Sequence, residues 1–94
     1  MNSVKNIAWV DRDYNKYTLE EISNRYLMNI LRFLCRGGGY TDYLDKDKIQ
    51  TLFDEAEKRG IKHTIDIKDA FDAFETKILG ETLNEMWLID ELNI

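Results

Sequence analysis

The sequence predicts a mainly α-helical fold of about three helices with a short N-terminal β-hairpin, in a single domain covering residues 1–94. Three observations support this prediction. Two short aromatic-rich segments near the N-terminus flank a group of turn-forming residues. Apolar residues then recur every three to four positions in three later segments. Proline is absent, and glycines stand where the first two helices are expected to end.

The hairpin is expected within residues 1–18, as a β-ribbon. An apolar run that contains Trp9 suits the first strand. Residues 11–15 are rich in aspartate and asparagine, which favour turns, and residues 16–18 are expected to return as the second strand. Two strands alone are marginally stable, so the ribbon is expected to lie on the helices or to pair with another chain.

The first helix is expected over residues 19–36. Thr18 and Glu21 have the spacing of a capping box, in which each residue satisfies an amide of the other. Glycines at 37–39 are expected to end the helix, because glycine adopts left-handed backbone angles at little cost. The apolar face is broad and consists of Leu19, Ile22, Tyr26, Leu27, Ile30, Leu31 and Leu34.

The second helix is expected over residues 43–60, with Thr41 or Asp42 as its N-cap and Gly60 as its C-terminal stop. The segment at 61–65 alternates between apolar and polar residues, so it is compatible with a strand or with a loop. The apolar positions of the helix follow the i, i+3, i+4, i+7 pattern at Ile49, Leu52, Phe53 and Ala56.

The third helix is expected over residues 66–92, beginning near Asp66. A glycine inside a helix costs about 1 kcal/mol, so this segment is read either as one long helix or as two helices that meet at Gly80. The C-terminal residues 86–94 are unusually apolar for a chain end. They are therefore expected to pack on the body or on a neighbouring subunit.

Charge and composition exclude several classes of protein. Residues 1–36 carry a charge balance of +2 and residues 37–94 a balance of −7, which argues against general nucleic-acid binding. No apolar run is long enough to cross a membrane, the N-terminus lacks the apolar core of a signal peptide, and a single cysteine excludes an internal disulfide. The cytoplasm is the expected compartment.

A domain this small gains from self-association, and the complementary charge of its two halves favours a homo-oligomer.

No catalytic or metal-binding pattern is found in the sequence. The single histidine and single cysteine are far apart, so no zinc cluster is expected, and the acidic residues lack the spacing of a calcium loop. The glycines at 37–39 follow a helix instead of preceding one, so a flexible connector is favoured over a phosphate-binding loop. The prediction is a protein without catalysis and without a cofactor.

Aromatic and arginine residues in the first 40 positions suggest a binding surface. Aromatic rings stack on planar ligands, and guanidinium groups hold phosphates. Most of these rings could instead pack in the core. Asn29, which lies among apolar helix residues, could instead satisfy a backbone group of the hairpin. The candidate ligand-binding residues are Trp9, Arg12, Tyr26, Asn29, Arg32, Arg36 and Tyr40.

Two blocks of the sequence resemble, in the same order, a family of small bacteriophage and prophage proteins. The family pattern is a tryptophan strand, an acidic-glycine turn and a helix containing His-Leu-x-Asn. Here the first block comprises Trp9, the turn at 11–15, Ile22 and the helical segment Tyr26-Leu27-Met28-Asn29-Ile30. Tyr26 stands in place of the usual histidine, and Tyr14 stands where glycine is common. The second block is Leu52-Phe53-Asp54-Glu55-Ala56-Glu57-Lys58-Arg59-Gly60-Ile61.

The resemblance implies a phage accessory protein that acts in the cytoplasm of an infected bacterial host. The first hypothesis is that it counters host defence by binding and sequestering a nucleotide-type immune signal, in a pocket between subunits. The alternative is an inhibitor that binds a host or defence protein through its acidic helical surface. A third possibility, an enzyme, requires an active-site group that the sequence does not reveal. The third helix has acidic residues at every third position, Asp66, Asp69, Asp72 and Glu75, which we call the acidic row.

Overall fold

The computed structural model describes residues 7–92, and it describes side chains for residues 7–80. Strands β1 (Ile7–Val10) and β2 (Lys16–Thr18) are followed by the short 3-10 helix η2 (Leu19–Glu21). Three α-helices complete the chain: α1 (Asn24–Cys35), α2 (Lys46–Lys58) and α3 (Ile67–Leu92). The predicted fold class, mainly α with a short N-terminal hairpin, is confirmed.

The two strands are antiparallel and pair with an irregular register. Ile7 faces Thr18 and Trp9 faces Tyr17, with a bulge between the two pairs. The bulge fits the burial pattern, because Ala8, Trp9 and Val10 are all buried although strict alternation would expose one of them. One side of the ribbon therefore lies on the helices, as the marginal stability of two isolated strands requires.

The first helix begins later than the sequence analysis predicted. The capping box is present, with the Thr18 amide donating to the Glu21 carboxylate at 2.8 Å, but it caps η2 and not α1. The chain is extended at Ile22, and a new N-cap at Ser23 accepts a hydrogen bond from the Tyr26 amide at 3.1 Å. The predicted helix over 19–36 is thus a single 3-10 turn followed by α1.

A long-range contact explains this interruption. The Arg59 guanidinium, which follows α2, donates to the carbonyl oxygens of Leu19 and Ile22, each at 2.8 Å. It also pairs with Glu55 at 2.7 Å, and both side chains are mostly buried. Because an arginine is bound to these carbonyls, η2 ends at Glu21 and the backbone turns before α1 starts.

The second helix is shorter than predicted at both ends. Residues 41–43 form a turn, and Asp45 is the N-cap, accepting from the Lys48 amide at 2.8 Å. The segment at 61–66 is a loop without strand pairing, which decides between the two alternatives left by the sequence. The chain leaves α2 through Gly60, whose φ of 72° lies in the left-handed region.

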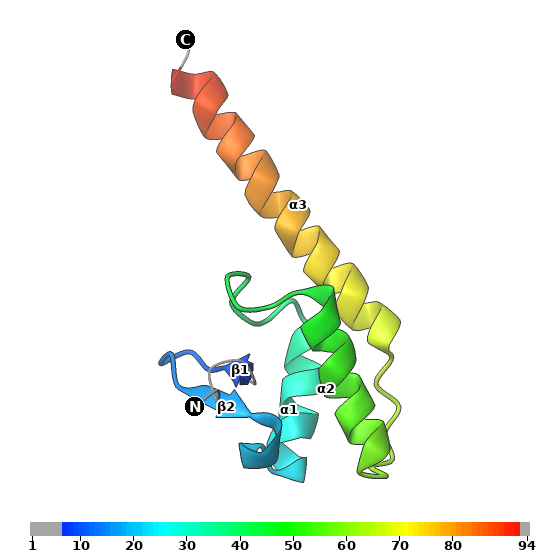
Figure 1. Cartoon of the computed structure of the whole chain (residues 1–94). Helices are drawn as coiled ribbons and strands as arrows, with labels where there is room; N and C mark the ends of the chain where they lie inside the picture. The colour runs from blue at the N-terminus through cyan, green and yellow to red at the C-terminus, as the bar shows by residue number, and fades with distance from the viewer. Residues whose placement is uncertain (1–6, 93–94) are drawn as a thin grey trace.

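The core lies between α1, α2 and the first half of α3, with the hairpin against α1 (Figure 1). Helix α3 runs without a break through Gly80, and its second half extends beyond the body (Figure 1). The apolar tail expected to pack on the body has side chains outside the described residues. Among the described residues, no helix is long and apolar enough to span a bilayer. The fully buried side chains are Ile22, Leu27, Ile30, Leu31, Leu34, Ile49 and Leu52.

Candidate ligand-binding site

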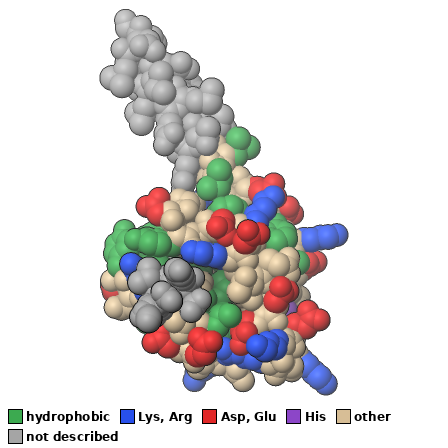
Figure 2. All heavy atoms as spheres, in the orientation of Figure 1, with side chains coloured by type: hydrophobic (Ala, Val, Ile, Leu, Met, Phe, Trp, Pro, Cys, Tyr) green, Lys and Arg blue, Asp and Glu red, His purple; other side chains and the backbone are tan. Residues whose placement is uncertain are grey.

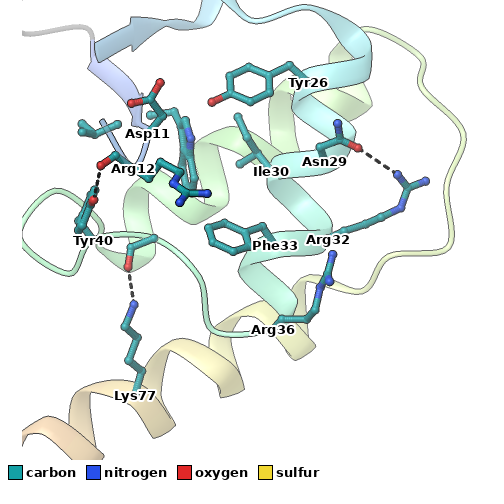
Figure 3. A pocket seen from close by; sticks show the side chains of 13 residues that line it. Asp11, Arg12, Tyr26, Asn29, Ile30, Arg32, Phe33, Arg36, Tyr40 and Lys77 are labelled. Carbon is teal, nitrogen blue, oxygen red and sulfur yellow. Dashed lines mark hydrogen bonds between the residues drawn. The ribbon is translucent and has the colours of Figure 1, made fainter. Parts of the chain in front are cut away.

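A pocket of about 570 Å³ lies between the hairpin, α1, the loop after α1 and α3 (Figure 3). We call it the hairpin pocket. Its volume falls in the range of about 300–1,000 Å³ typical of small-molecule sites. All seven candidate residues from the sequence line it. The complete lining is Trp9, Val10, Asp11, Arg12, Tyr26, Asn29, Ile30, Arg32, Phe33, Arg36, Gly39, Tyr40 and Lys77.

Helix α1 contributes two adjacent stripes to the pocket. Tyr26, Ile30 and Phe33 point toward the hairpin, because residues spaced by three and four share one face of a helix (Figure 3). The second stripe is polar and consists of Asn29, Arg32 and Arg36. It lies along the neighbouring side of the same helix (Figure 3). A ligand along α1 would therefore meet rings and aliphatic groups on one side and cations on the other.

The hairpin forms the opposite wall. Trp9 is 6% exposed, so most of the indole belongs to the core, but part of it lines the pocket and meets Phe33 edge to face at 6.2 Å between ring centroids. Three residues later, Arg12 has an exposed side chain that lies toward Phe33 in the pocket (Figure 3). Trp9 can therefore pack in the core and also contact a ligand, because different parts of its ring face the core and the pocket.

The loop after α1 closes a third side of the pocket. The Tyr40 hydroxyl donates to the Arg12 carbonyl at 2.7 Å, which fastens this loop to the hairpin. The Lys77 ammonium donates to the Gly39 carbonyl, which fastens the same loop to α3 (Figure 3). Gly39 has a φ of 103°, and a Cβ there would lie 3.0 Å from Leu44. Glycine at this position lets the loop approach the core closely.

Asp11 is the single carboxylate among the lining residues, and its oxygens already have four donors. The backbone amides of Asp13 and Asn15 donate to Oδ1, both at 2.9 Å. The Asn15 amide side chain and the Tyr17 hydroxyl donate to Oδ2, at 3.1 Å and 3.0 Å. A carboxylate has about four acceptor positions, so Asp11 organises the turn and has little remaining capacity for a ligand or a metal.

The same contacts set the protonation of Asp11 and Tyr17. Burial alone would raise the pKa of Asp11, but the hydrogen bonds from Asn15, Tyr17 and Asp13 together lower it below its ordinary value. The hydrogen bond to Asp11 raises the pKa of Tyr17. At neutral pH the carboxylate is therefore ionised and the phenol protonated, which is the pairing that the turn requires.

The cationic groups of the pocket have few partners of their own. Within residues 7–80, the guanidinium groups of Arg12 and Arg36 make no ion pair or hydrogen bond. Arg32 makes one long contact, donating to the Asn29 oxygen at 3.5 Å. Buried protein charges are normally paired, whereas these groups are exposed and free to bind an anion. The arrangement is chemically suited to holding a phosphate or carboxylate next to an apolar ring.

Tyr26 adds a hydrogen-bond donor to the aromatic stripe. Burial raises the pKa of the Tyr26 phenol, so it remains protonated at neutral pH. Its ring meets Tyr17 edge to face at 5.4 Å, which fixes its position on the hairpin side of α1. A protonated hydroxyl at this place can donate to a ligand oxygen.

Six lining residues were not among the sequence candidates. Ile30 and Phe33 were detectable in principle, because they share a helix face with Tyr26. Val10 and Asp11 adjoin candidate positions, but the sequence indicated only strand and turn roles for them. Gly39 and Lys77 meet through tertiary contact across 38 positions, for which the sequence carries no local signal.

The single cysteine and the single histidine lie outside the hairpin pocket. Burial raises the pKa of the Cys35 thiol, so a smaller fraction of it is thiolate at neutral pH. The His63 Nδ1 atom accepts from the Ile65 amide at 3.0 Å within the loop before α3. Across the residues searched, no three histidine, cysteine, aspartate or glutamate side chains are placed to hold a metal ion.

The acidic row is divided among different roles. Asp66 accepts from the Lys68 amide at 2.9 Å and so caps the start of α3. Glu75 pairs with Lys46 at 3.0 Å on the surface. In the view of Figure 2, acidic and basic side chains alternate over the body instead of forming one acidic face. Two members of the row, Asp66 and Glu75, therefore have contacts of their own.

Comparison of the chain with models of known protein families, with curated proteins and with solved structures finds no match. The geometry of the hairpin pocket is consequently the basis for a functional assignment.

Proposed function

We propose that this chain is a non-enzymatic phage accessory protein that binds and sequesters a nucleotide-type immune signal in the hairpin pocket. One observation carries the proposal: the guanidinium groups of Arg12 and Arg36, which have no partner among the described residues, stand beside an aromatic wall, while the single lining carboxylate is saturated by its own turn. Stacking and charge-assisted hydrogen bonds to phosphate are the two interactions that such a ligand needs. The phage context comes from the sequence resemblance.

The chemistry of the lining supports binding in preference to turnover. Its side chains are cations, rings, an amide, aliphatic groups and the Asp11 carboxylate, whose oxygens already have four donors. Among the described lining residues there is no histidine, thiol or serine. A nucleophile beside a base is the arrangement that covalent catalysis requires. The lining lacks that pair, so the proposed action is sequestration of an intact ligand.

Titration calorimetry with adenosine monophosphate, cyclic nucleotides and ADP-ribose tests the proposal. The protein is expected to bind at least one of them with a 1:1 ratio of ligand to pocket. Measurements at several protein concentrations would detect a pocket that is completed by self-association. The absence of heat with every ligand, across the concentration series, would contradict the proposed function.

Two arginine variants provide the matched test of the site. Arg36→Ala removes a guanidinium from the pocket lining, and Arg25→Ala removes an exposed guanidinium from the same helix outside the lining. Loss of a charged hydrogen bond to phosphate costs about 1.5 kcal/mol or more, so Arg36→Ala is expected to weaken binding about tenfold. Arg25→Ala is expected to bind as the parent does. Equal effects of both variants would show that general charge, and not the pocket, attracts the ligand.

A further inference from the structure

A strained aromatic residue lies just outside the hairpin pocket. Tyr14 has a φ of 65°, the one non-glycine residue with positive φ among those described. Glycine, asparagine or aspartate adopts this conformation readily, whereas a bulky aromatic residue there is uncommon. The hydrogen bonds of Asp11 hold the turn in this shape, and they involve no part of the Tyr14 side chain. The turn itself therefore does not require an aromatic ring at position 14.

The Tyr14 ring extends the aromatic wall of the pocket outward. It stacks on the Tyr40 ring with 4.8 Å between centroids and 6° between planes, and Tyr40 lines the pocket. Tyr43 approaches Tyr14 edge-on at 6.4 Å. In spite of these contacts Tyr14 is 58% exposed. Figure 2 shows hydrophobic side chains gathered on the flank where the hairpin turn and the loop after α1 lie in Figure 1.

Arg12 connects the inner and the outer aromatic groups along the hairpin. Along the chain it lies between Trp9, which packs edge-on against Phe33 inside the pocket, and Tyr14 on the rim. Its carbonyl is fixed by the Tyr40 hydroxyl, while its exposed guanidinium remains unpaired within the described part of the chain. An aromatic residue of the pocket, a cation and a second aromatic residue therefore follow one another along the hairpin.

We propose that Tyr14 forms a second stacking site, so that the preferred ligand has two planar ring systems joined by phosphate groups. This inference rests on the proposed function and specifies its ligand class. The first ring lies against Phe33 and Trp9 in the pocket, the phosphates lie at Arg12, and the second ring stacks on the exposed Tyr14 ring. The backbone of Tyr14 is strained while its ring is exposed, and a contact between that ring and a ligand would explain this combination.

Two commercial ligands isolate the second ring. Diadenosine diphosphate and ADP-ribose share one adenine, two phosphates and two riboses, and only the former has a second base. Base–aromatic stacking is expected to make diadenosine diphosphate bind on the order of tenfold more tightly in calorimetry. Equal affinities would overturn the inference and leave the proposed function standing. If neither ligand bound while a mononucleotide or cyclic nucleotide did, the inference alone would fail. If none of the nucleotides bound, the proposed function would fail with it.

Variants at position 14 separate a ligand contact from a structural role. Tyr14→Gly suits the positive φ and removes the ring, so it is expected to abolish the preference for diadenosine diphosphate while leaving ADP-ribose affinity unchanged. Tyr14→Phe keeps the stacking face and is expected to retain the preference. Thermal unfolding of both variants verifies that the fold persists. A Tyr14→Gly protein that still prefers the two-base ligand would refute the assignment.

Discussion

The most demanding test of the fold concerns Arg59, which connects the end of α2 to the segment before α1. Its guanidinium donates to the carbonyls of Leu19 and Ile22, to the Asn24 side chain at 3.0 Å and to the Glu55 carboxylate. The Arg59 and Glu55 side chains are 18% and 15% exposed. Substitution by alanine removes the donors but leaves the carbonyls and the carboxylate in place.

The expected loss follows from the groups that remain unpaired. Each charged hydrogen bond to a carbonyl contributes about 1.5–3 kcal/mol, and removal of one partner from a largely buried ion pair costs about 3–5 kcal/mol. These estimates overlap because they describe the same side chain. Arg59→Ala is therefore expected to lower the free energy of unfolding by about 3–5 kcal/mol, a large share of the total for a small domain.

Urea unfolding followed by circular dichroism measures this loss, and a thermal scan should show a decrease in Tm of more than about 12 °C. Arg59→Lys keeps the charge but lacks the planar fork, so an intermediate loss is expected. Arg25→Ala, at an exposed arginine, should change stability by less than about 0.5 kcal/mol. A loss below about 1 kcal/mol for Arg59→Ala would refute the idea that this arginine determines where α1 begins.

Three further experiments test the pocket wall, the hairpin turn and the burial of Cys35. Gly38→Ala places a Cβ on the Phe33 ring, so the exposed ring must move out of the pocket wall, and calorimetry should show weaker ligand binding with a Tm change of only a few degrees. Asp11 has a lowered pKa despite the opposing effect of burial, so its contribution to stability is present above about pH 4 and is lost as the pH falls through the folded-state value. The stability difference between the parent and Asp11→Asn, measured by urea unfolding, should therefore shrink below pH 4. Burial raises the pKa of Cys35, so its alkylation by iodoacetamide at pH 8 should be slower in the folded protein than in urea.

The hairpin and the three helices could be predicted because their signals are local. Apolar periodicity indicated all three helices, and glycines indicated where the first two end. For the third segment, the sequence left open whether one helix runs through Gly80 or two helices meet there. The start of α1 could not be predicted in the same way. The capping box at Thr18 is a genuine local signal, but Arg59, 40 positions beyond Leu19, ends the turn that it begins.

The candidate site was predictable for the part that lies on one helix. Tyr26, Asn29 and Arg36 have spacings that place them on neighbouring sides of α1, and this requires only the helical repeat. That Trp9 would face the same helix depended on how the ribbon folds back. The contribution of Lys77 depended on the contact between α3 and the glycine loop, which is a property of the assembled chain.

The charge distribution suggests how the pocket would distinguish a small anion from a long one. The chain has a formal net charge of −5, yet the pocket lining has four cations and a single carboxylate with saturated oxygens. At physiological salt, charges are screened beyond about 8 Å, so a ligand inside the pocket experiences mainly the local guanidinium groups. A nucleic acid extends beyond that distance and also meets the acidic remainder of the surface. If the proposed function holds, the chain would attract a small phosphorylated ligand and disfavour a polyanion, and this selectivity would arise from the placement of a few arginines and not from the overall charge.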